Sequence, residues 1–283
     1  MNNQKNCPIC GHPLFEGNCY FCFEEQSFEK NLCPAWLADK NKKILRQAQE
    51  ALKQSKTAIL YCKNRGLNYQ KWGLGFIPDG AKLVPYGSEK NPESWWNRIL
   101  FPICDIEGNI IAFGGRTILT EKEIEATEET VAKYKNSFGG KYYSKGKNLY
   151  LYHLLPEKSK RPVCLVEGYC DAITAIDHNF LCVATLGTAF TREQALLLSK
   201  KAERIRLCFD NDEHGEIAAK KALLTLCRIG VDPNNISRMI LKGSKDIDEA
   251  LRKREHIEFV SVKDVYGDDR KLISALYGRK ETF

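Results

Sequence analysis

The sequence predicts an α/β fold in which a parallel sheet forms the second half of the chain, after a mixed α+β unit. Three observations lead to this prediction. Beyond residue 161, apolar runs of strand length alternate with segments of helix length. Between residues 57 and 160, shorter apolar runs are interrupted by glycine and proline. The first 22 residues contain two Cys-x-x-Cys pairs, which predict a small separate unit at the start of the chain.

Length and composition narrow the class of protein. A chain of 283 residues is long enough for two compact units and a small third one. It contains no apolar run of about 18 residues and no signal-peptide pattern, so we expect no membrane span and a cytoplasmic location. Lysine and arginine number 43 against 36 aspartate and glutamate residues, a surplus that permits a polyanionic partner without requiring one.

The cysteine pairs near the N-terminus have the spacing of a structural zinc site. Cys7 and Cys10 form the first pair, and Cys19 and Cys22 form the second. Two residues between the members of each pair allow all four thiolates to reach one tetrahedral Zn²⁺ ion. A segment this short buries little apolar surface, so the bound metal would supply its folding energy. The alternatives are a redox dithiol or a ligand set that includes His12.

The middle of the chain predicts a helix followed by a basic mixed unit. Residues 28–56 are polar with apolar residues at helical spacing, which is typical of a helical connector. In residues 57–160, the runs ILFPICD and NIIAFGG flank Glu107-Gly108, and this pattern predicts a β-hairpin. The later stretch EKEIEATEET is interpreted as a solvated acidic loop.

Acidic residues follow the strand-length runs of the second half. Glu167 ends the run VCLVE, and Asp210 ends the run RIRLCFD, with Asp212 two positions later. Because the carboxyl ends of parallel strands meet at one edge of a sheet, we expect these side chains to gather there. Three further carboxylates are expected at the same edge: Asp171, Asp246 and Asp248.

Carboxylates gathered in this way raise one another's pKa unless cations neutralise them. Oxygen ligands of this kind suit Mg²⁺ or Mn²⁺, so the sequence predicts a divalent-cation site. The alternative is that single members of the set only cap helix N-termini, and for Asp246 taken alone that interpretation is preferred.

These motifs resemble those of a known family. VEGYCDAI, TLGTAFT, CFDNDEHGEIAAKKA and KGSKDIDEAL are similar to the successive motifs of the Toprim domain in bacterial DnaG-type DNA primases. Upstream, RILFPICDIEGNIIAFGGR, KYKNS and SKGKNLY resemble the basic half of the same catalytic core. The expected division is a zinc-ribbon-like knuckle at 1–27, a helical connector at 28–56, a basic subdomain at 57–160, a Toprim domain at 161–260 and a tail at 261–283.

The resemblance implies a DNA primase, a nucleotidyltransferase that copies single-stranded DNA into short RNA primers from ribonucleoside triphosphates. It implies catalytic roles for Glu167, Asp210 and Asp212, which with Asp171, Asp246 and Asp248 would hold the divalent cations. The positions that match nucleotide or nucleic-acid contacts of the family are Arg98, Arg116, Lys133, Tyr134, Asn136 and Lys145.

The chain also departs from the family pattern. The four-cysteine knuckle is shorter than the usual zinc domain, and Phe138, Gly139 and Gly140 follow KYKNS where proline and threonine are usual. About thirty residues follow the last motif, so we expect no helicase-docking domain, although the family implies a replicative helicase as partner. This reduced plan resembles primases of phages or mobile elements. The alternative functions are a Toprim-type nuclease and a non-catalytic nucleic-acid-binding accessory protein of replication.

Overall fold

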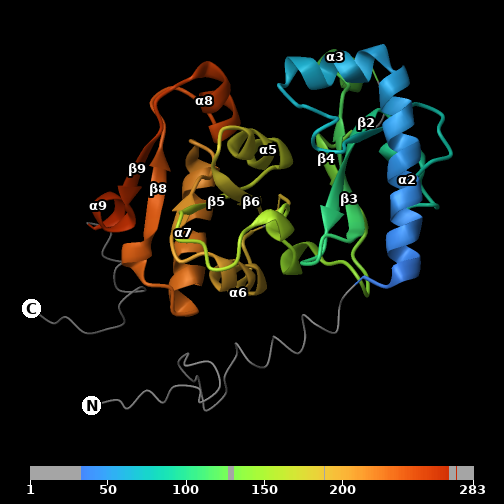
Figure 1. Ribbon diagram of the computed structural model, residues 1–283. Coiled ribbons are helices and arrows are strands. Elements are labelled where there is room, and N and C mark those ends of the chain that lie inside the picture. The colour runs from blue at the N-terminus through green and yellow to red at the C-terminus, as the bar shows by residue number, and fades with distance from the viewer. Residues whose placement is uncertain (1–32, 127–130, 188, 268–271, 273–283) are drawn as a thin grey trace, which may run out of the picture.

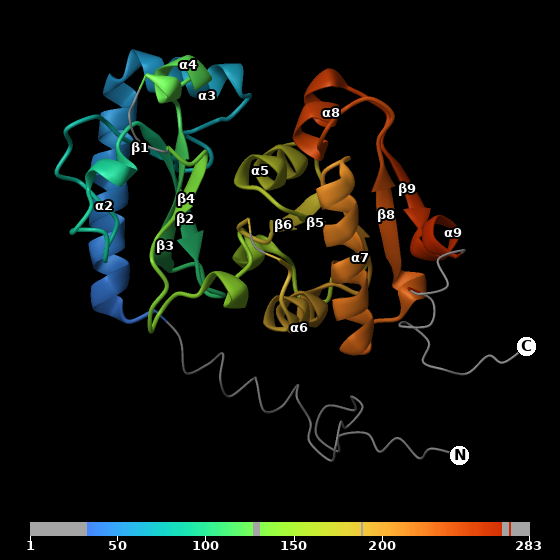
Figure 2. The ribbon, with the colours of Figure 1, turned by 180° about the vertical axis from the view of Figure 1, so that it is seen from behind.

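Two units, each built on its own sheet, lie side by side (Figures 1 and 2). The computed structural model describes residues 33–126, 131–187, 189–267 and 272. The predicted zinc knuckle and most of the predicted tail fall outside these residues. Among the helices in the described ranges, none is both long and apolar enough to cross a bilayer.

The first unit contains a four-stranded antiparallel sheet in the order β1-β2-β3-β4. Its strands are β1 (Gly75–Ile77), β2 (Arg98–Cys104), β3 (Ile110–Thr117) and β4 (Tyr134–Asn136). The hairpin predicted around Glu107-Gly108 is confirmed, since β2 and β3 pair on either side of that turn. Gly108 has a φ of +88°, which favours glycine, and the Asp105 carboxylate accepts backbone N–H bonds from Glu107 and Asn109.

Helix α2 (Ala35–Gln54) covers one face of this sheet and is followed by α3 (Lys56–Asn64). The apolar side of α2 is buried, and the helix packs so closely on β1 that a Cβ on Gly75 would lie 2.5 Å from the Cβ of Ala48. The helix predicted within residues 28–56 is therefore part of the first unit's core. The acidic stretch contains the short helix α4 (Glu121–Glu125), and 3₁₀ turns lie at Glu93–Trp95, Lys145–Lys147 and Tyr152–Leu154.

The second unit contains a five-stranded sheet in the order β6-β5-β7-β8-β9. Strands β5 (Val163–Val166), β6 (Leu181–Ala184), β7 (Ile205–Leu207) and β8 (Ile236–Ile240) are parallel, which confirms the predicted fold class. The edge strand β9 (Glu258–Ser261) runs antiparallel to β8. The helices of this unit are α5 (Tyr169–Asp177), α6 (Arg192–Lys201), α7 (Glu213–Arg228), α8 (Ile247–Lys253) and α9 (Val262–Tyr266), with a 3₁₀ turn at Pro233–Asn235.

The two units share one continuous apolar core at their junction. Tyr169, in the first turn of α5, stacks on Phe101 of β2 with ring centroids 5.0 Å apart and meets Tyr150 edge-on at 4.7 Å. The Tyr169 hydroxyl donates a hydrogen bond to the side-chain oxygen of Asn136 in β4. Since aromatic pairs add to the stabilisation from area burial, this junction holds the two sheets in a defined arrangement.

Candidate active site

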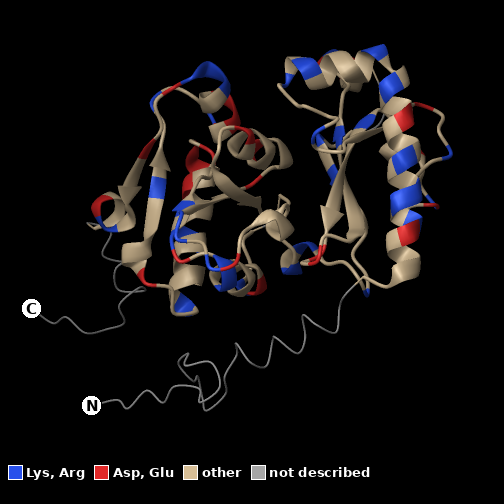
Figure 3. Ribbon diagram, viewed as in Figure 1, with Lys and Arg blue, Asp and Glu red and all other residues tan. Residues whose placement is uncertain are grey.

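A cavity of about 400 Å³ lies where the carboxyl ends of the second unit's parallel strands face the first unit. Figure 3 shows acidic residues gathered near α5 and α8 on this side of the second unit. The charged residues that line the cavity carry both signs. The carboxylates are Glu167, Asp171, Asp210, Asp246 and Glu249, and the cations are Arg65, Arg116, Lys133, Lys245 and Arg252.

Two of the predicted catalytic carboxylates line this cavity, at or shortly after the ends of parallel strands. Glu167 immediately follows β5, and Asp210 lies three residues after β7, which ends at Leu207 rather than at Asp210 as the sequence suggested. Burial raises the pKa of Glu167, and the nearby charge of Asp210 raises it further. Burial also raises the pKa of Asp210, opposed by the Lys245 ammonium, whose Nζ lies 3.2 Å from Asp210 Oδ2.

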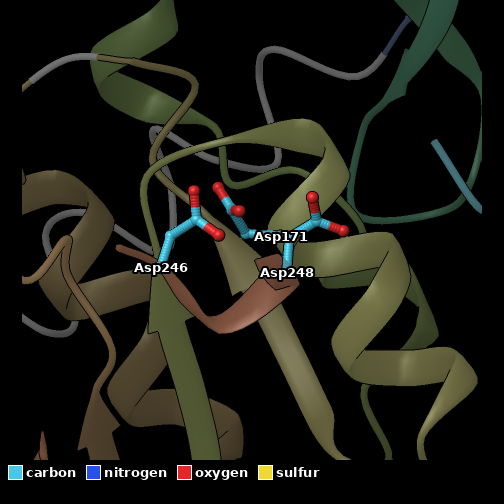
Figure 4. A group of neighbouring side chains, drawn as sticks. All are labelled: Asp171, Asp246 and Asp248. Atoms are coloured by element: carbon cyan, nitrogen blue, oxygen red, sulfur yellow. The ribbon is translucent and has the colours of Figure 1, made fainter. Parts of the chain in front are cut away.

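A second group of carboxylates lies beside them. The carboxylates of Asp171, Asp246 and Asp248 each offer an oxygen within 4.8 Å of the other two, and Figure 4 shows the three side by side at the starts of α5 and α8. Burial raises the pKa of Asp171 to about 7, and the charges of Asp246 and Asp248 add to this shift. One Asp171 oxygen accepts the Gly168 N–H at 3.1 Å. A Cβ at position 168 would lie 2.6 Å from that oxygen, so a side chain here would push the Asp171 carboxylate out of its place.

Two of the predicted ligands also cap helices. Asp246 accepts the Glu249 N–H at 2.8 Å at the start of α8, and Asp212 accepts the Gly215 N–H at 2.9 Å at the start of α7. Both residues therefore cap a helix, and this uses one oxygen of each carboxylate. Asp246 still lines the cavity, whereas Asp212 does not. Helix α7 begins tightly against Asp210, since a Cβ on Gly215 would lie 2.1 Å from the Asp210 carbonyl oxygen.

Asp248 differs from the other five predicted carboxylates because protein donors surround it. Its side chain is 1% exposed, and it accepts hydrogen bonds from Thr174, Arg252 and Arg65. It does not line the cavity itself. The two arginines that bind it do line the cavity.

Three residues of the predicted nucleotide-binding set line the cavity: Arg116, Lys133 and Tyr134. The Arg116 guanidinium donates to the hydroxyls of Tyr61, at 2.5 Å, and of Tyr134. Burial lowers the pKa of Lys133, and the positive charges of Arg116, Lys245 and Arg65 lower it further. The cations around Lys133 therefore repel one another, which is the electrostatic condition for binding an anion.

Asn136 does not line the cavity itself, but it links the two units. Its amide nitrogen donates to the Leu186 carbonyl at 3.3 Å. Leu186 and Gly187, in the loop after β6, both line the cavity and have φ values of +67° and +73°. A leucine whose backbone is in the left-handed region is strained, so contacts with the rest of the structure must hold this loop in place. The hydrogen bond from Asn136 is one of these contacts.

The structure places the other two predicted contacts, Arg98 and Lys145, outside the cavity. Arg98 is 4% exposed, and its guanidinium donates to the backbone carbonyls of Ser94 and Ala132, each at 2.9 Å. Its geometry is that of a residue that fixes the local backbone. Lys145 lies in a 3₁₀ turn, and its backbone carbonyl accepts a hydrogen bond from the Gln194 side chain at 2.9 Å. Burial lowers the pKa of the Lys145 ammonium.

Sequence reasoning missed three cations of the cavity. Lys245 directly precedes Asp246, and Arg252 lies four positions after Asp248 in α8, so charge patterning along KGSKDIDEALRK could have identified both. Arg65 ends α3 in the first unit and lies 183 positions from its partner Asp248. No local pattern indicates this pairing.

Comparisons with known proteins agree with this architecture. Residues 82–155 match the family model of the DNA primase catalytic core, N-terminal domain, and residues 164–251 match the Toprim-like model. The fold and its acidic edge thus define a Toprim protein. More particularly, the chain contains a DnaG-type DNA primase catalytic core with its Toprim domain.

Curated relatives include DNA primases of bacteria. The DNA primase of Legionella pneumophila is 31% identical over 227 residues, which cover 71% of this chain and 38% of the relative. The DNA primase of Aquifex aeolicus is 31% identical over 230 residues, which cover 72% of this chain and 44% of the relative. The chain therefore spans less than half the length of these relatives.

Solved structures with the same fold include three primase cores. The zinc-binding and RNA polymerase domains of the Aquifex aeolicus primase are 27% identical with a TM-score of 0.64, covering 83% of this chain and 59% of that one. A primase domain from Pseudomonas aeruginosa is 27% identical with a TM-score of 0.63, covering 82% and 78%. The DnaG catalytic domain solved with single-stranded DNA is 25% identical with a TM-score of 0.63, covering 83% and 79%.

Proposed function

We propose that this chain is a DNA primase, a DNA-directed RNA polymerase that synthesises short RNA primers on a single-stranded DNA template. The observation that carries the proposal is the cavity itself, where carboxylates at the strand ends of a Toprim sheet face cations from a primase-type basic unit. Joining a ribonucleoside triphosphate to a growing chain requires both kinds of charge at one place. Its place of action is the cytoplasm of a bacterial or phage-infected cell.

The carboxylates fit a divalent cation by their chemistry. All donors at the edge are oxygens, and burial together with the charges of neighbouring carboxylates raises the pKa values of Glu167 and Asp171 above their ordinary values. When bound, Mg²⁺ or Mn²⁺ neutralises the triphosphate and activates the attacking hydroxyl. The residues proposed to hold the cations are Glu167, Asp171, Asp210, Asp212 and Asp246. Asp248, the sixth residue of the predicted set, accepts hydrogen bonds from Thr174, Arg252 and Arg65 instead.

The cations of the cavity wall are proposed to hold the nucleotide. Arg116 is fixed by the hydroxyls of Tyr61 and Tyr134, so its guanidinium keeps its position without a ligand. Lys133 lies among other cations, so a bound anion would relieve their repulsion. The template is proposed to be single-stranded DNA, in line with the related catalytic domain solved with it. Lys145, outside the cavity, is proposed to contact nucleic acid there.

The N-terminal cysteines are proposed to bind one structural Zn²⁺ ion through Cys7, Cys10, Cys19 and Cys22. These residues lie outside the described part of the structure. The knuckle together with the catalytic core is proposed to resemble the primases of phages or mobile elements. A replicative helicase is the proposed partner.

The decisive experiment combines primer synthesis with the variant Asp210→Asn. Wild-type protein is incubated with single-stranded DNA, labelled ribonucleotides and Mg²⁺ or Mn²⁺, and short RNA is the expected product. Asp210→Asn keeps the side-chain shape but removes a charge, so synthesis should fall by orders of magnitude while the melting temperature and DNA binding stay near wild type. Asp79→Asn, at an exposed site outside the cavity, is the matched control.

The same assay separates the other functions. Loss of the DNA template would indicate a nuclease, and retention of DNA without RNA synthesis would indicate an accessory binding protein. Wild-type synthesis by a correctly folded Asp210→Asn variant would contradict the proposed catalytic centre.

A further inference from the structure

Asp248 is saturated by donors from the protein. Its Oδ1 accepts hydrogen bonds from Thr174 Oγ1 at 2.7 Å and Arg252 Nε at 3.2 Å. Its Oδ2 accepts bonds from Arg65 Nη2 and Arg252 Nη2, each at 3.1 Å. An ionised carboxylate offers about four acceptor positions, so these four bonds use its capacity. A metal ion could bind Asp248 only by displacing one of these donors.

The two arginines that bind Asp248 also oppose a cation on Asp248 itself, although the carboxylates of Asp171 and Asp246 each offer an oxygen within 4.8 Å. Arg65 and Arg252 share this one buried carboxylate, so the three groups together carry a net positive charge. Both guanidiniums line the cavity. The side chain of Arg65 is 28% exposed and that of Arg252 is 34% exposed, so each guanidinium is only partly withdrawn from solvent. This arrangement presents a preorganised positive site to an anion in the cavity.

Arg65 reaches the site from the first unit. It forms the C-cap of α3, and its Nε is buried without a hydrogen-bond partner. A buried N–H donor without a partner is costly and calls for an explanation. An anion drawn between the guanidiniums would give Arg65 further acceptors while leaving its bond to Asp248 in place.

We propose that Asp248 is a positioning residue rather than a metal ligand, and that it holds Arg65 and Arg252 to bind the phosphates of the incoming nucleoside triphosphate. Guanidinium groups match phosphate oxygens in geometry and remain charged at all relevant pH values. The identity of the ligand rests on the proposed function. The roles of Asp248 and Arg65 themselves rest on the contacts above.

The first test measures binding of inorganic tripolyphosphate by titration calorimetry without divalent cations. Arg65→Gln should weaken binding about tenfold, because it removes a charged hydrogen-bond donor. Arg65→Lys keeps the positive charge but lacks the paired N–H donors of the guanidinium, so it should weaken tripolyphosphate binding by less than Arg65→Gln. Arg46→Gln is the matched control, since Arg46 is exposed on α2 outside the cavity. Equal affinities of Arg65→Gln and Arg46→Gln would overturn the assignment of Arg65.

The second test separates positioning from metal binding. Mn²⁺ affinity is measured from the electron paramagnetic resonance signal of the free ion. Asp171→Asn and Asp246→Asn should weaken Mn²⁺ binding, whereas Asp248→Asn should leave it unchanged and weaken tripolyphosphate binding instead. In primer synthesis, Asp248→Asn should raise the nucleotide KM more than it lowers kcat. Weaker Mn²⁺ binding by Asp248→Asn, with tripolyphosphate binding intact, would overturn the proposal.

Removal of a buried acid that binds two arginines threatens folding. If Asp248→Asn fails to fold, the double variant Asp248→Asn/Arg65→Gln removes the acid together with one of its cations, and its Mn²⁺ affinity answers the same question. Neither binding test requires RNA synthesis. A protein that makes no primers but binds tripolyphosphate through Arg65 would refute the proposed function and leave this inference intact.

Discussion

Tyr169 lies directly against Gly114, so that a Cβ on Gly114 would lie 2.3 Å from the Cζ atom of the Tyr169 ring. Gly114 belongs to β3 of the first unit, and Tyr169 belongs to α5 of the second. The same tyrosine begins the helix that carries Asp171. The absence of a side chain at position 114 is therefore what allows the two halves of the cavity to approach each other.

We predict that Gly114→Ala destabilises the protein by about 1–3 kcal/mol, since overpacking in a close-packed core forces side chains or backbone to move. Thermal unfolding followed by circular dichroism measures this change. Gly140→Ala is the control, because a Cβ there has no atom within 4 Å. Equal melting temperatures of the two variants would contradict the importance of this contact.

The metal-free protein should lose stability as the pH rises. The folded-state pKa of Asp171 is about 7, above its ordinary value of 3.8. Between these two values, the folded protein holds a proton that the unfolded chain has released, so the free energy of unfolding falls as pH rises through this window. We expect the chelated wild type to be less stable at pH 8 than at pH 5, by on the order of 1–3 kcal/mol from this group.

Denaturant unfolding at several pH values in the presence of a chelator measures this effect. Asp171→Asn should be more stable than wild type at pH 8 and should show a shallower pH dependence, because it cannot ionise. Saturating Mg²⁺ should remove most of the difference, since the cation stabilises the ionised carboxylate. An identical pH dependence in wild type and Asp171→Asn would show that Asp171 titrates outside this window.

Lys245 should act in opposite directions on the two kinds of ligand. Its ammonium pairs with Asp210 at 3.2 Å and lines the cavity. Lys245→Gln removes a positive charge, so we predict Mn²⁺ binding a few-fold tighter and tripolyphosphate binding a few-fold weaker. Lys242→Gln, at an exposed position outside the cavity, is the control. A change of both affinities in the same direction would contradict an electrostatic role for Lys245 in this cavity.

Zinc content tests the N-terminal knuckle. We predict about one zinc ion per chain, bound by four thiolates. Cys19→Ser should release the ion while the rest of the protein stays folded, as metal analysis and thermal unfolding can show. A truncated chain that begins at residue 31 should contain no zinc. Full zinc content in that shortened chain would place the metal elsewhere.

Periodicity and strand ends were enough to predict the parts of the fold that follow local rules. Glu167 and Asp210 lie at the sheet edge where the parallel-strand pattern places them, because the carboxyl ends of parallel strands must meet. The end of β7 was misplaced by three residues, since Cys208 and Phe209 are apolar and buried although they lie beyond the strand. Burial alone does not distinguish a strand from the turn that follows it.

The charged partners of the site were harder to predict. Arg98 and Lys145 lie in motifs of the family, but neither lines the cavity, and Arg98 is buried with its guanidinium bonded to backbone carbonyls. Arg65 contributes to the cavity only through tertiary packing of α3. Contacts of this kind depend on how two distant segments meet, and a single sequence carries no periodic signal for that.

The separation of Arg65 from Asp248 by 183 positions has a consequence for how the protein acquires its activity. Antiparallel pairs such as β2 and β3 close short loops and can form early, whereas a contact between such distant residues must wait for larger parts of the chain to order. We therefore expect the cavity to be assembled among the last events of folding. A nascent or partly unfolded chain would contain all the reactive residues and yet have no place for a nucleotide to react.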